Sequence, residues 1–360
     1  MLKPVYFPFC LLLALAGCAT KPSTPPPDWN GDSADSGVEI EHIAEGPQIA
    51  PPRELPPQSA LVRTNAHFAN IWIPLERWSR EHHAGTLTQI SPAPTPVFSL
   101  ATSNGVMLLA AGSLIAKWEG AEFRLGFEPQ MVGEHLLVHA LDLKKNIEPL
   151  LQPLGALEKS NRTIVIDAGH GGSNAGTRSV IDGTNEKEFT LDWALRLQPL
   201  METNGWQVWL TRTNDVEMSL SNRVAFAEEH QADLILSLHF NSAAPHHEQS
   251  GLETICLTPA GMHSTFTRGY EDNPALVFAN NSFDAENLRY AMLLQRELLK
   301  ECGFVDRGVR RARFLGVLRG QNRPAVLLEG GFLSNTNEAR RIADPEFRQK
   351  LAEAVARALK

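Results

Sequence analysis

The sequence has 360 residues, of which 43% are hydrophobic, and its formal net charge at pH 7 is −8. This length suits two domains on the usual scale of about 100 to 200 residues per domain. An acidic chain of this kind lacks the concentrated positive charge that nucleic-acid binding requires, so we expect no nucleic-acid partner.

The first residues of the chain have the form of an export signal. Lys3 precedes an apolar run that is too short to span a bilayer, and small residues follow it. The letters LAGC at residues 15–18 resemble the lipobox of bacterial lipoproteins, which implies a signal peptide at 1–17 and lipidation of Cys18. A plain signal peptide with an incidental cysteine is the alternative. Ala19 resembles an outer-membrane sorting residue, so we expect a periplasmic protein of the cell envelope, held on the membrane by the lipid on Cys18.

Residues 18–58 are rich in proline, serine and acidic residues and show no apolar period. Such a composition buries too little surface to offset the entropy of ordering, so we predict a disordered tether. A small β-rich domain is predicted over residues 59–155, because short apolar runs alternate there with turn dipeptides. This region loosely resembles the N-terminal domain named after copper amine oxidases, which implies targeting or spacing. His135 and His139 have a four-residue spacing, but Leu136 stands where a metalloprotease helix carries glutamate, so no metal role is expected for them.

After residue 160 the pattern changes to alternating strands and helices, which predicts an α/β domain over residues 160–360. The expected strands are 163–167, 206–212, 233–238, 252–257 and 325–328, and the expected helices are 187–203, 220–230, 285–302 and 345–359. Asp344 and Pro345 supply a cap and a first helical residue for the last helix. Of the four cysteines, only Cys256 and Cys302 fall in this domain. We expect buried core thiols, although pairing in an oxidising compartment is an alternative.

Four side chains in this domain form a candidate site. His170 and His239 each follow a predicted strand, Glu186 lies at a helix start, and Glu329 ends a third strand. Sites in α/β sheets form at such strand ends. A catalytic zinc takes three protein ligands, commonly two histidines and one carboxylate, and leaves one position for water. A remaining carboxylate would then serve as the general base.

Four separated segments, IVIDAGHGG, NEKEFTL, LTRTNDVEMSLSNRVAFAEEHQADLILSLHFNSA and PAVLLEGGFLSNTNEARRI, resemble the zinc-dependent N-acetylmuramoyl-L-alanine amidases of the type 3 group. The resemblance covers residues 162–358. It implies a mixed sheet flanked by helices, Zn²⁺ as cofactor with His170, Glu186 and His239 as ligands, and Glu329 as the catalytic glutamate. It also implies peptidoglycan as substrate, cut between N-acetylmuramic acid and L-alanine, and an activator protein as a candidate partner.

Several neighbouring residues carry secondary expectations. Asp167 either holds a ligand histidine in its tautomer through a hydrogen bond or caps the glycine turn. Arg212 and Arg223 are expected to form an ion pair or cap with Asp215. Asn174 stands where many relatives have an acidic residue and is given no ligand role, and Phe240 is expected to narrow the substrate groove.

The stretch 259–283 is longer than a minimal member of this family needs. It is interpreted as a surface insertion, with a lid or regulatory segment as the alternative. Two other functions stay open for the whole chain: a catalytically silent peptidoglycan-binding lipoprotein, and a zinc peptidase acting on stem peptides. The absence of a G-x-S-x-G elbow, a phosphate-binding loop and an H-E-x-x-H motif argues against serine hydrolases, nucleotide enzymes and zincins.

Overall fold

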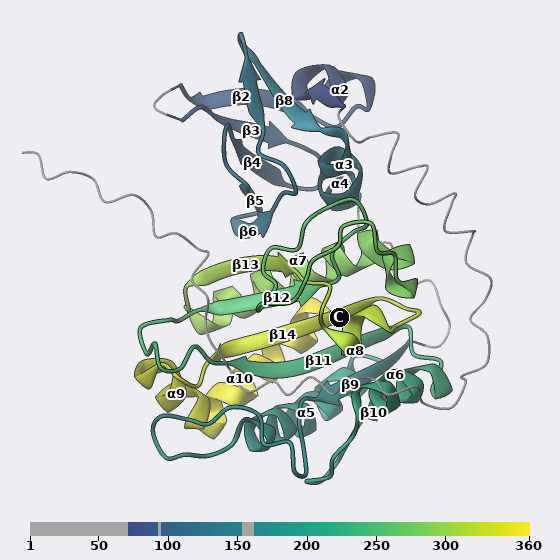
Figure 1. Cartoon of the computed structure of the whole chain (residues 1–360), viewed down its shortest axis with the longest axis vertical. Helices are drawn as coiled ribbons and strands as arrows, with labels where there is room; N and C mark the ends of the chain where they lie inside the picture. The colour runs from purple at the N-terminus through teal and green to yellow at the C-terminus, as the bar shows by residue number, and fades with distance from the viewer. Residues whose placement is uncertain (1–70, 93–94, 153–161) are drawn as a thin grey trace, which may run out of the picture. The chain divides into compact units, whose positions relative to one another are not determined.

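The computed structural model describes residues 71–92, 95–152 and 162–360 (Figure 1). The predicted signal peptide, Cys18 and the tether at 18–58 lie outside these residues. Within the described part, none of the helices combines the length and the apolar character that a bilayer crossing requires.

The core of the protein is a mixed sheet, as the family resemblance implies. Its strand order is β10-β9-β11-β14-β12-β13, continued by β6-β5-β4-β3-β2. Strands β10, β9, β11 and β14 run parallel, whereas β12 is antiparallel to β14 and parallel to β13. The bounds are β9 (Thr163–Ala168), β10 (Gln207–Leu210), β11 (Leu234–Asn241), β12 (Leu252–Cys256), β13 (Asp306–Arg311) and β14 (Ala325–Phe332).

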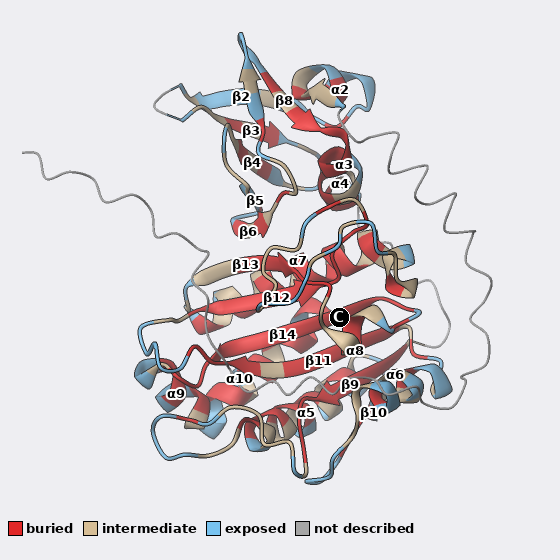
Figure 2. Cartoon of the chain, in the orientation of Figure 1, coloured by how far each residue is buried: buried red, intermediate tan, exposed pale blue. Residues whose placement is uncertain are grey.

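Helices cover both faces of these strands. One face packs against the helices α5 (Glu186–Thr203), α7 (Asp284–Cys302) and α10 (Pro345–Ala358) through a core that includes Trp193, Leu298 and Leu351. The opposite face packs against α6 (Leu220–Glu229) and α8 (Gly316–Arg319) through a smaller core around Ile235 and Leu327. Figure 2 shows the central strands β9, β11, β12 and β14 as almost wholly buried. Helix α9 (Thr336–Ala343) and the 3-10 turn η2 (Ala279–Phe283) complete this half.

The four helices predicted here are confirmed, and Asp344 caps α10 by accepting a hydrogen bond from the Glu346 amide at 2.9 Å. Strand β13 was not predicted, because its sequence DRGVRR contains a single apolar residue. β13 is a strand because β12 pairs with it on one side and β6 on the other. Cys256 and Cys302 are buried free thiols, as expected.

The β-rich region is confirmed, and it is joined to the large sheet. Its elements are β1 (Trp72–Pro74), α2 (Leu75–Glu81), β2 (Thr86–Ser91), β3 (Val97–Ala101), β4 (Val106–Ala110), β5 (Ile115–Trp118), β6 (Ala121–Arg124), β7 (Gln130–Val132), β8 (His135–His139), α3 (Ala140–Asp142), η1 (Leu143–Ile147) and α4 (Glu148–Leu151). β2 to β6 form an antiparallel meander, while β1, β8 and β7 form a separate three-stranded sheet. β6 pairs with β13, and the Glu122 amide donates to Asp306 Oδ2 at 2.8 Å.

Candidate metal centre and active site

Three of the four predicted site residues meet at the carboxyl ends of the parallel strands. His170 follows β9, His239 lies near the end of β11, and Glu186 is the first residue of α5. One ligand atom from each side chain can be chosen so that all three lie within 4.8 Å of one another. Parallel strands end at the same edge of the sheet, which is why residues so far apart in the chain converge here.

Glu186 is the centre of this cluster. Its Oε1 lies 3.0 Å from His239 Nδ1 and accepts a hydrogen bond from the Phe240 amide at 3.0 Å. Its Oε2 lies 3.1 Å from His170 Nε2 and accepts from the Thr177 amide at 3.1 Å. Burial disfavours the charged carboxylate, but His170 and His239 outweigh it and hold the pKa of Glu186 well below its ordinary value. Glu186 is therefore kept as an anion.

The two histidines have different surroundings. Burial lowers the pKa of His239 despite the nearby Glu186. Burial acts the same way on His170, but Glu186 outweighs it and the pKa of His170 is raised. The Nδ1 of His170 is hydrogen-bonded to Asn174 Oδ1 at 2.7 Å. If Asn174 accepts from Nδ1, the Nε2 lone pair faces the cluster.

Two glycines allow the cluster to close. A Cβ on Gly169 would lie 2.4 Å from the ring of His239. Gly176 has a φ of +66°, and its Cβ would lie 2.7 Å from Glu186 Oε2. Both positions therefore exclude any side chain.

Two buried arginines hold the turn that carries His170, which corrects the expected pairing with Asp215. Arg212 donates to the carbonyl oxygens of Ala168 and Gly169, and Arg223 donates to the carbonyl oxygen of His170 at 2.7 Å. Asp215 instead pairs with Lys187 at 2.6 Å. The prediction was wrong because sequence proximity favoured Asp215, whereas the turn's buried carbonyl groups need donors from neighbouring elements.

Asp167 contacts one of these two buried arginines. It accepts hydrogen bonds from Thr211 and Ser237 and pairs with Arg223 at 2.5 Å. Burial opposes its ionisation, but Arg223 outweighs it and lowers the pKa of Asp167. Its contact with the histidine turn runs through the guanidinium of Arg223, and its described hydrogen bonds involve no histidine ring.

Glu329 lies next to the cluster on β14, in register with His239 on β11. Its side chain is buried, and its Oε2 has no hydrogen-bond partner among the described residues. Burial, reinforced by the negative charge of Glu186, raises the pKa of Glu329 well above its ordinary value. A carboxyl group whose pKa is raised in this way holds a proton more readily than an ordinary glutamate, which suits a group that exchanges protons with a substrate.

The stretch 259–283 brings an arginine beside Glu329. Asp272 pairs with Arg313, and Arg313 also donates to the Pro259 carbonyl oxygen at 3.0 Å, which fixes the start of this stretch. The guanidinium of Arg268 then lies 4.0 Å from Glu329 Oε1. The segment thus reaches the candidate site, and no sequence pattern indicated that Arg268 would.

Phe240 does not narrow a groove. Its side chain is 2% exposed and packs in the core, with ring centroids 5.4 Å from Trp193 and 6.2 Å from Phe189. Successive residues of a strand point to opposite faces. Because His239 faces the site, Phe240 must face the helices α5 and α10.

The donor set fits a catalytic metal ion. Two imidazoles and one carboxylate are the ligands that zinc commonly takes in hydrolases. His170 Nε2 is buried and has no hydrogen-bond partner among the described residues, although Glu186 lies 3.1 Å away. A buried ring nitrogen that has no protein hydrogen-bond partner and faces a carboxylate is typical of a metal ligand.

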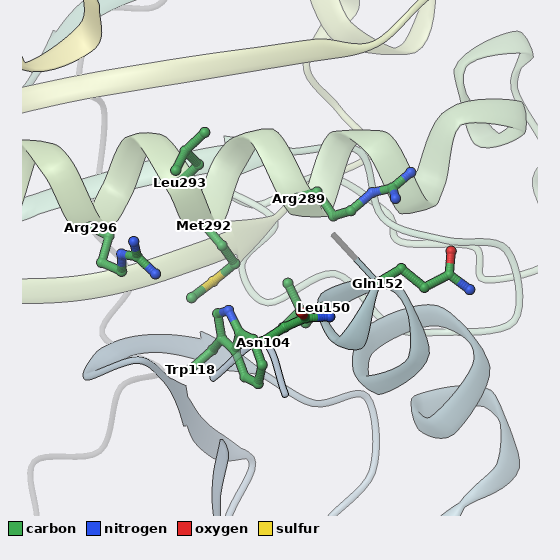
Figure 3. A pocket seen from close by; sticks show the side chains of 8 residues that line it. All are labelled: Asn104, Trp118, Leu150, Gln152, Arg289, Met292, Leu293 and Arg296. Carbon is green, nitrogen blue, oxygen red and sulfur yellow. The ribbon is translucent and has the colours of Figure 1, made fainter. Parts of the chain in front are cut away.

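A cavity of about 230 Å³ lies elsewhere, against α7 (Figure 3). Trp118, Leu150, Met292 and Arg296 are among the residues that line it, and none of the candidate site residues does. Because α7 packs on the sheet face opposite to His239, this cavity is separate from the candidate site.

Comparison with known proteins finds amidases in each case. Residues 164–360 match the family described as N-acetylmuramoyl-L-alanine amidase, Amidase_3. The chain is 33% identical over 198 residues to the N-acetylmuramoyl-L-alanine amidase CwlM of Bacillus licheniformis, covering 54% of this chain and 66% of that relative. It is 29% identical over 246 residues to the amidase AmiC of Escherichia coli O6:H1, covering 61% of this chain and 58% of that relative. The chain thus spans about two thirds or less of these relatives.

A solved structure also aligns with this chain. The catalytic domain of the amidase CwlV from Bacillus (Paenibacillus) polymyxa var. colistinus is 28% identical, with a TM-score of 0.46. The alignment covers 55% of this chain and 96% of that domain.

Proposed function

The chain belongs to the N-acetylmuramoyl-L-alanine amidase family, and from this premise we propose that it is a zinc-dependent peptidoglycan hydrolase cutting the amide bond between N-acetylmuramic acid and L-alanine. The observation that carries the proposal is the cluster of His170, Glu186 and His239 with Glu329 beside it. A family member that had lost activity would be expected to lack one of these four groups.

In this proposal His170, Glu186 and His239 hold the metal. When bound, zinc supplies Lewis acidity, which lowers the pKa of a water toward about 7 and stabilises negative charge on the amide oxygen. Glu186 contributes the one negative charge of the ligand set, held by the Phe240 and Thr177 amides. Asn174 orients the ring of His170, and Arg223 fixes the turn beneath it.

Glu329 has the role of proton carrier. With its raised pKa it accepts the proton of the attacking water and returns it to the alanine nitrogen as the amide bond breaks. The oxygen of the water ends on the lactyl carboxyl group and the two hydrogens end on the amine side, so the reaction is a balanced hydrolysis. The partnerless Oε2 of Glu329 supports this role because an oxygen already accepting strong hydrogen bonds would be a poorer base.

The test is a digest of purified sacculi with the full-length chain in mild detergent, with and without a zinc chelator, analysed by mass spectrometry. We expect intact stem peptides that begin with L-alanine, lost on chelation and restored by zinc. Shortened peptides would favour the peptidase alternative. Sacculi left intact by a zinc-loaded protein would favour the silent binding protein.

We further propose the domain arrangement and location expected from the sequence: signal at 1–17, lipidated Cys18, tether at 18–58, accessory domain at 59–155 and amidase domain at 160–360. The loose likeness of the accessory domain to the copper amine oxidase N-terminal module supports a role in targeting. Because the stretch 259–283 lies beside Glu329, it is the proposed point of action for an activator protein. Incorporation of labelled palmitate, lost in Cys18→Ser, tests the lipid anchor, and fractionation of inner and outer membranes tests its location.

A further inference from the structure

The turn that carries His170 has three consecutive residues with positive φ angles. The angles are 62° at His170, 129° at Gly171 and 59° at Gly172. Glycine adopts such angles freely, but a histidine in the left-handed region is strained and keeps this conformation only where its surroundings fix it. Because His170 is a proposed metal ligand, the groups that hold this turn decide where one of the three ligands lies.

The loop at residues 213–217, which follows β10, packs against this turn. A Cβ on Gly171 would collide with the carbonyl oxygen of Val216, and a Cβ on Gly172 would lie 2.6 Å from the backbone nitrogen of Glu217. The backbones of the turn and the loop are therefore closer than side chains at these two positions would allow. Asp215 lies in the middle of this loop.

Asp215 and Lys187 together bind both backbone polar groups of Gly172. The Oδ1 of Asp215 accepts a hydrogen bond from the Gly172 amide at 2.8 Å. The Nζ of Lys187 donates to the Gly172 carbonyl oxygen at 2.8 Å and to Asp215 Oδ2 at 2.6 Å. The hydrogen bond from Lys187 lowers the pKa of Asp215, which keeps this group a carboxylate at neutral pH. We name this closed ring of hydrogen bonds the Gly172 clamp.

The Gly172 clamp joins the histidine turn to the start of α5, because Lys187 directly follows the proposed ligand Glu186. The clamp lies towards solvent, with the side chain of Lys187 14% exposed and that of Asp215 56% exposed. A buried link joins the same two segments, since Arg212 Nη2 donates to the carbonyl oxygens of Gly169 at 2.9 Å and of Lys187 at 2.7 Å. The turn and the helix are thus connected at two points.

We propose that Lys187 and Asp215 are positioning residues, which fix the spacing between His170 and Glu186 and thereby set the affinity of the site for its metal. The proposal deepens, and rests on, the proposed metal centre. His170 Nε2 and Glu186 Oε2 lie 3.1 Å apart, on the two segments that the Gly172 clamp joins. Ligands that are already in place bind a metal ion more tightly than ligands that must first be ordered, because less conformational entropy is lost on binding.

The experiment measures the zinc affinity of the full chain in mild detergent, by competition with a chelating dye. Lys187→Met removes the ammonium donors and keeps an apolar side chain, so zinc affinity should fall about tenfold, the low end of the range for groups that orient metal ligands. Asp215→Asn should cause a similar loss. The double variant should lose little more than either single variant, because the two residues act as one unit. Lys187→Arg keeps the charge and donors and should restore part of the affinity.

Cobalt(II) bound in place of zinc gives a second readout, because its visible absorption depends on how its ligands are arranged. The absorption bands should shift in Lys187→Met. The melting temperature of the metal-free variant should stay within about 4 °C of the wild type, since an ion pair this exposed adds little to stability. Lys300→Met is the matched control, because Lys300 pairs with Glu297 at the same 2.6 Å on α7 and should keep the wild-type affinity and spectrum.

The possible outcomes separate the clamp from the metal centre. Wild-type zinc affinity in both Lys187→Met and Asp215→Asn, or an equal loss in Lys300→Met, would overturn the positioning role and leave the metal centre standing. A loss of affinity that came with a large drop in the metal-free melting temperature would also overturn it, because the pair would then be a general support of the fold. A wild type that bound neither zinc nor cobalt would overturn the metal centre, and the positioning role with it.

Discussion

The surroundings of Glu186 and of Glu329 differ although both glutamates are buried at the same edge of the sheet. Glu186 is contacted by two imidazoles and accepts two backbone hydrogen bonds, and its pKa is lowered. Glu329 has an oxygen with no described partner, and its pKa is raised. Burial acts on both in the same direction, so the neighbouring charges and donors decide which one stays ionised. One carboxyl group is thereby suited to hold a cation and the other to carry a proton.

The largest effect is expected at Glu329. Glu329→Gln removes the proton carrier and keeps the shape, so turnover of sacculi should fall by about 10² to 10⁴-fold while zinc content stays near that of the wild type. Glu338→Gln, on α9, is a control for loss of a buried carboxyl group that is not one of the candidate site residues. Full activity of the Glu329 variant would refute the division of roles between the two glutamates.

Arg223 tests whether a paired cation is what keeps a buried carboxylate ionised. Arg223→Met leaves Asp167 charged and without its partner, and breaking such a buried pair costs about 3 to 5 kcal/mol of unfolding free energy. Chemical denaturation measures this loss. The double variant with Asp167→Asn should recover part of it, and an additive double variant would show that the pair is not coupled.

Asp142 extends this comparison, because burial there outweighs both the hydrogen-bond donors and the nearby cation Arg311. It accepts hydrogen bonds from the Gly126 and Phe127 amides and from Asn146, yet burial raises its pKa to about 6. A raised folded pKa favours the protonated form. Protonated Asp142 therefore contributes fully to the free energy of unfolding below the pKa of an unfolded aspartate. This contribution is lost as the pH rises through about 6, by an amount on the order of 3 kcal/mol.

Chemical denaturation of the wild type at several pH values between 4 and 7 measures how steeply the free energy of unfolding falls with pH. Asp142→Asn cannot titrate, so its unfolding free energy should lack the corresponding decrease with pH. An identical slope in the variant and the wild type would show that Asp142 is not the group responsible.

The smallest effect is expected at Asn174, which orients His170 from outside the cluster. Asn174→Ala removes the hydrogen bond to Nδ1 and should weaken zinc binding about 10 to 100-fold in a competition with a chelating dye. Asn174→Asp is the matched variant, and its negative charge should strengthen binding relative to the wild type. Equal zinc affinity in all three proteins would show that the orientation of His170 does not depend on this residue.

The sequence by itself determined the alternation of strands and helices after residue 160, and the placement of the four candidate site residues at strand ends and at a helix start. These follow from local rules, because apolar periodicity, caps and glycines act over a few neighbouring residues. The mixed sheet flanked by helices came from the family resemblance and agrees with the structure, whereas the order of the strands was not predicted.

Only the tertiary structure decided which charged groups became partners. Arg223 pairs with Asp167 and not with Asp215, β13 is a strand despite its arginines, and Arg268 reaches Glu329 from a segment without a motif. The physical reason is that a buried charge or carbonyl group takes the nearest donor in space, and that neighbour is set by how distant segments pack.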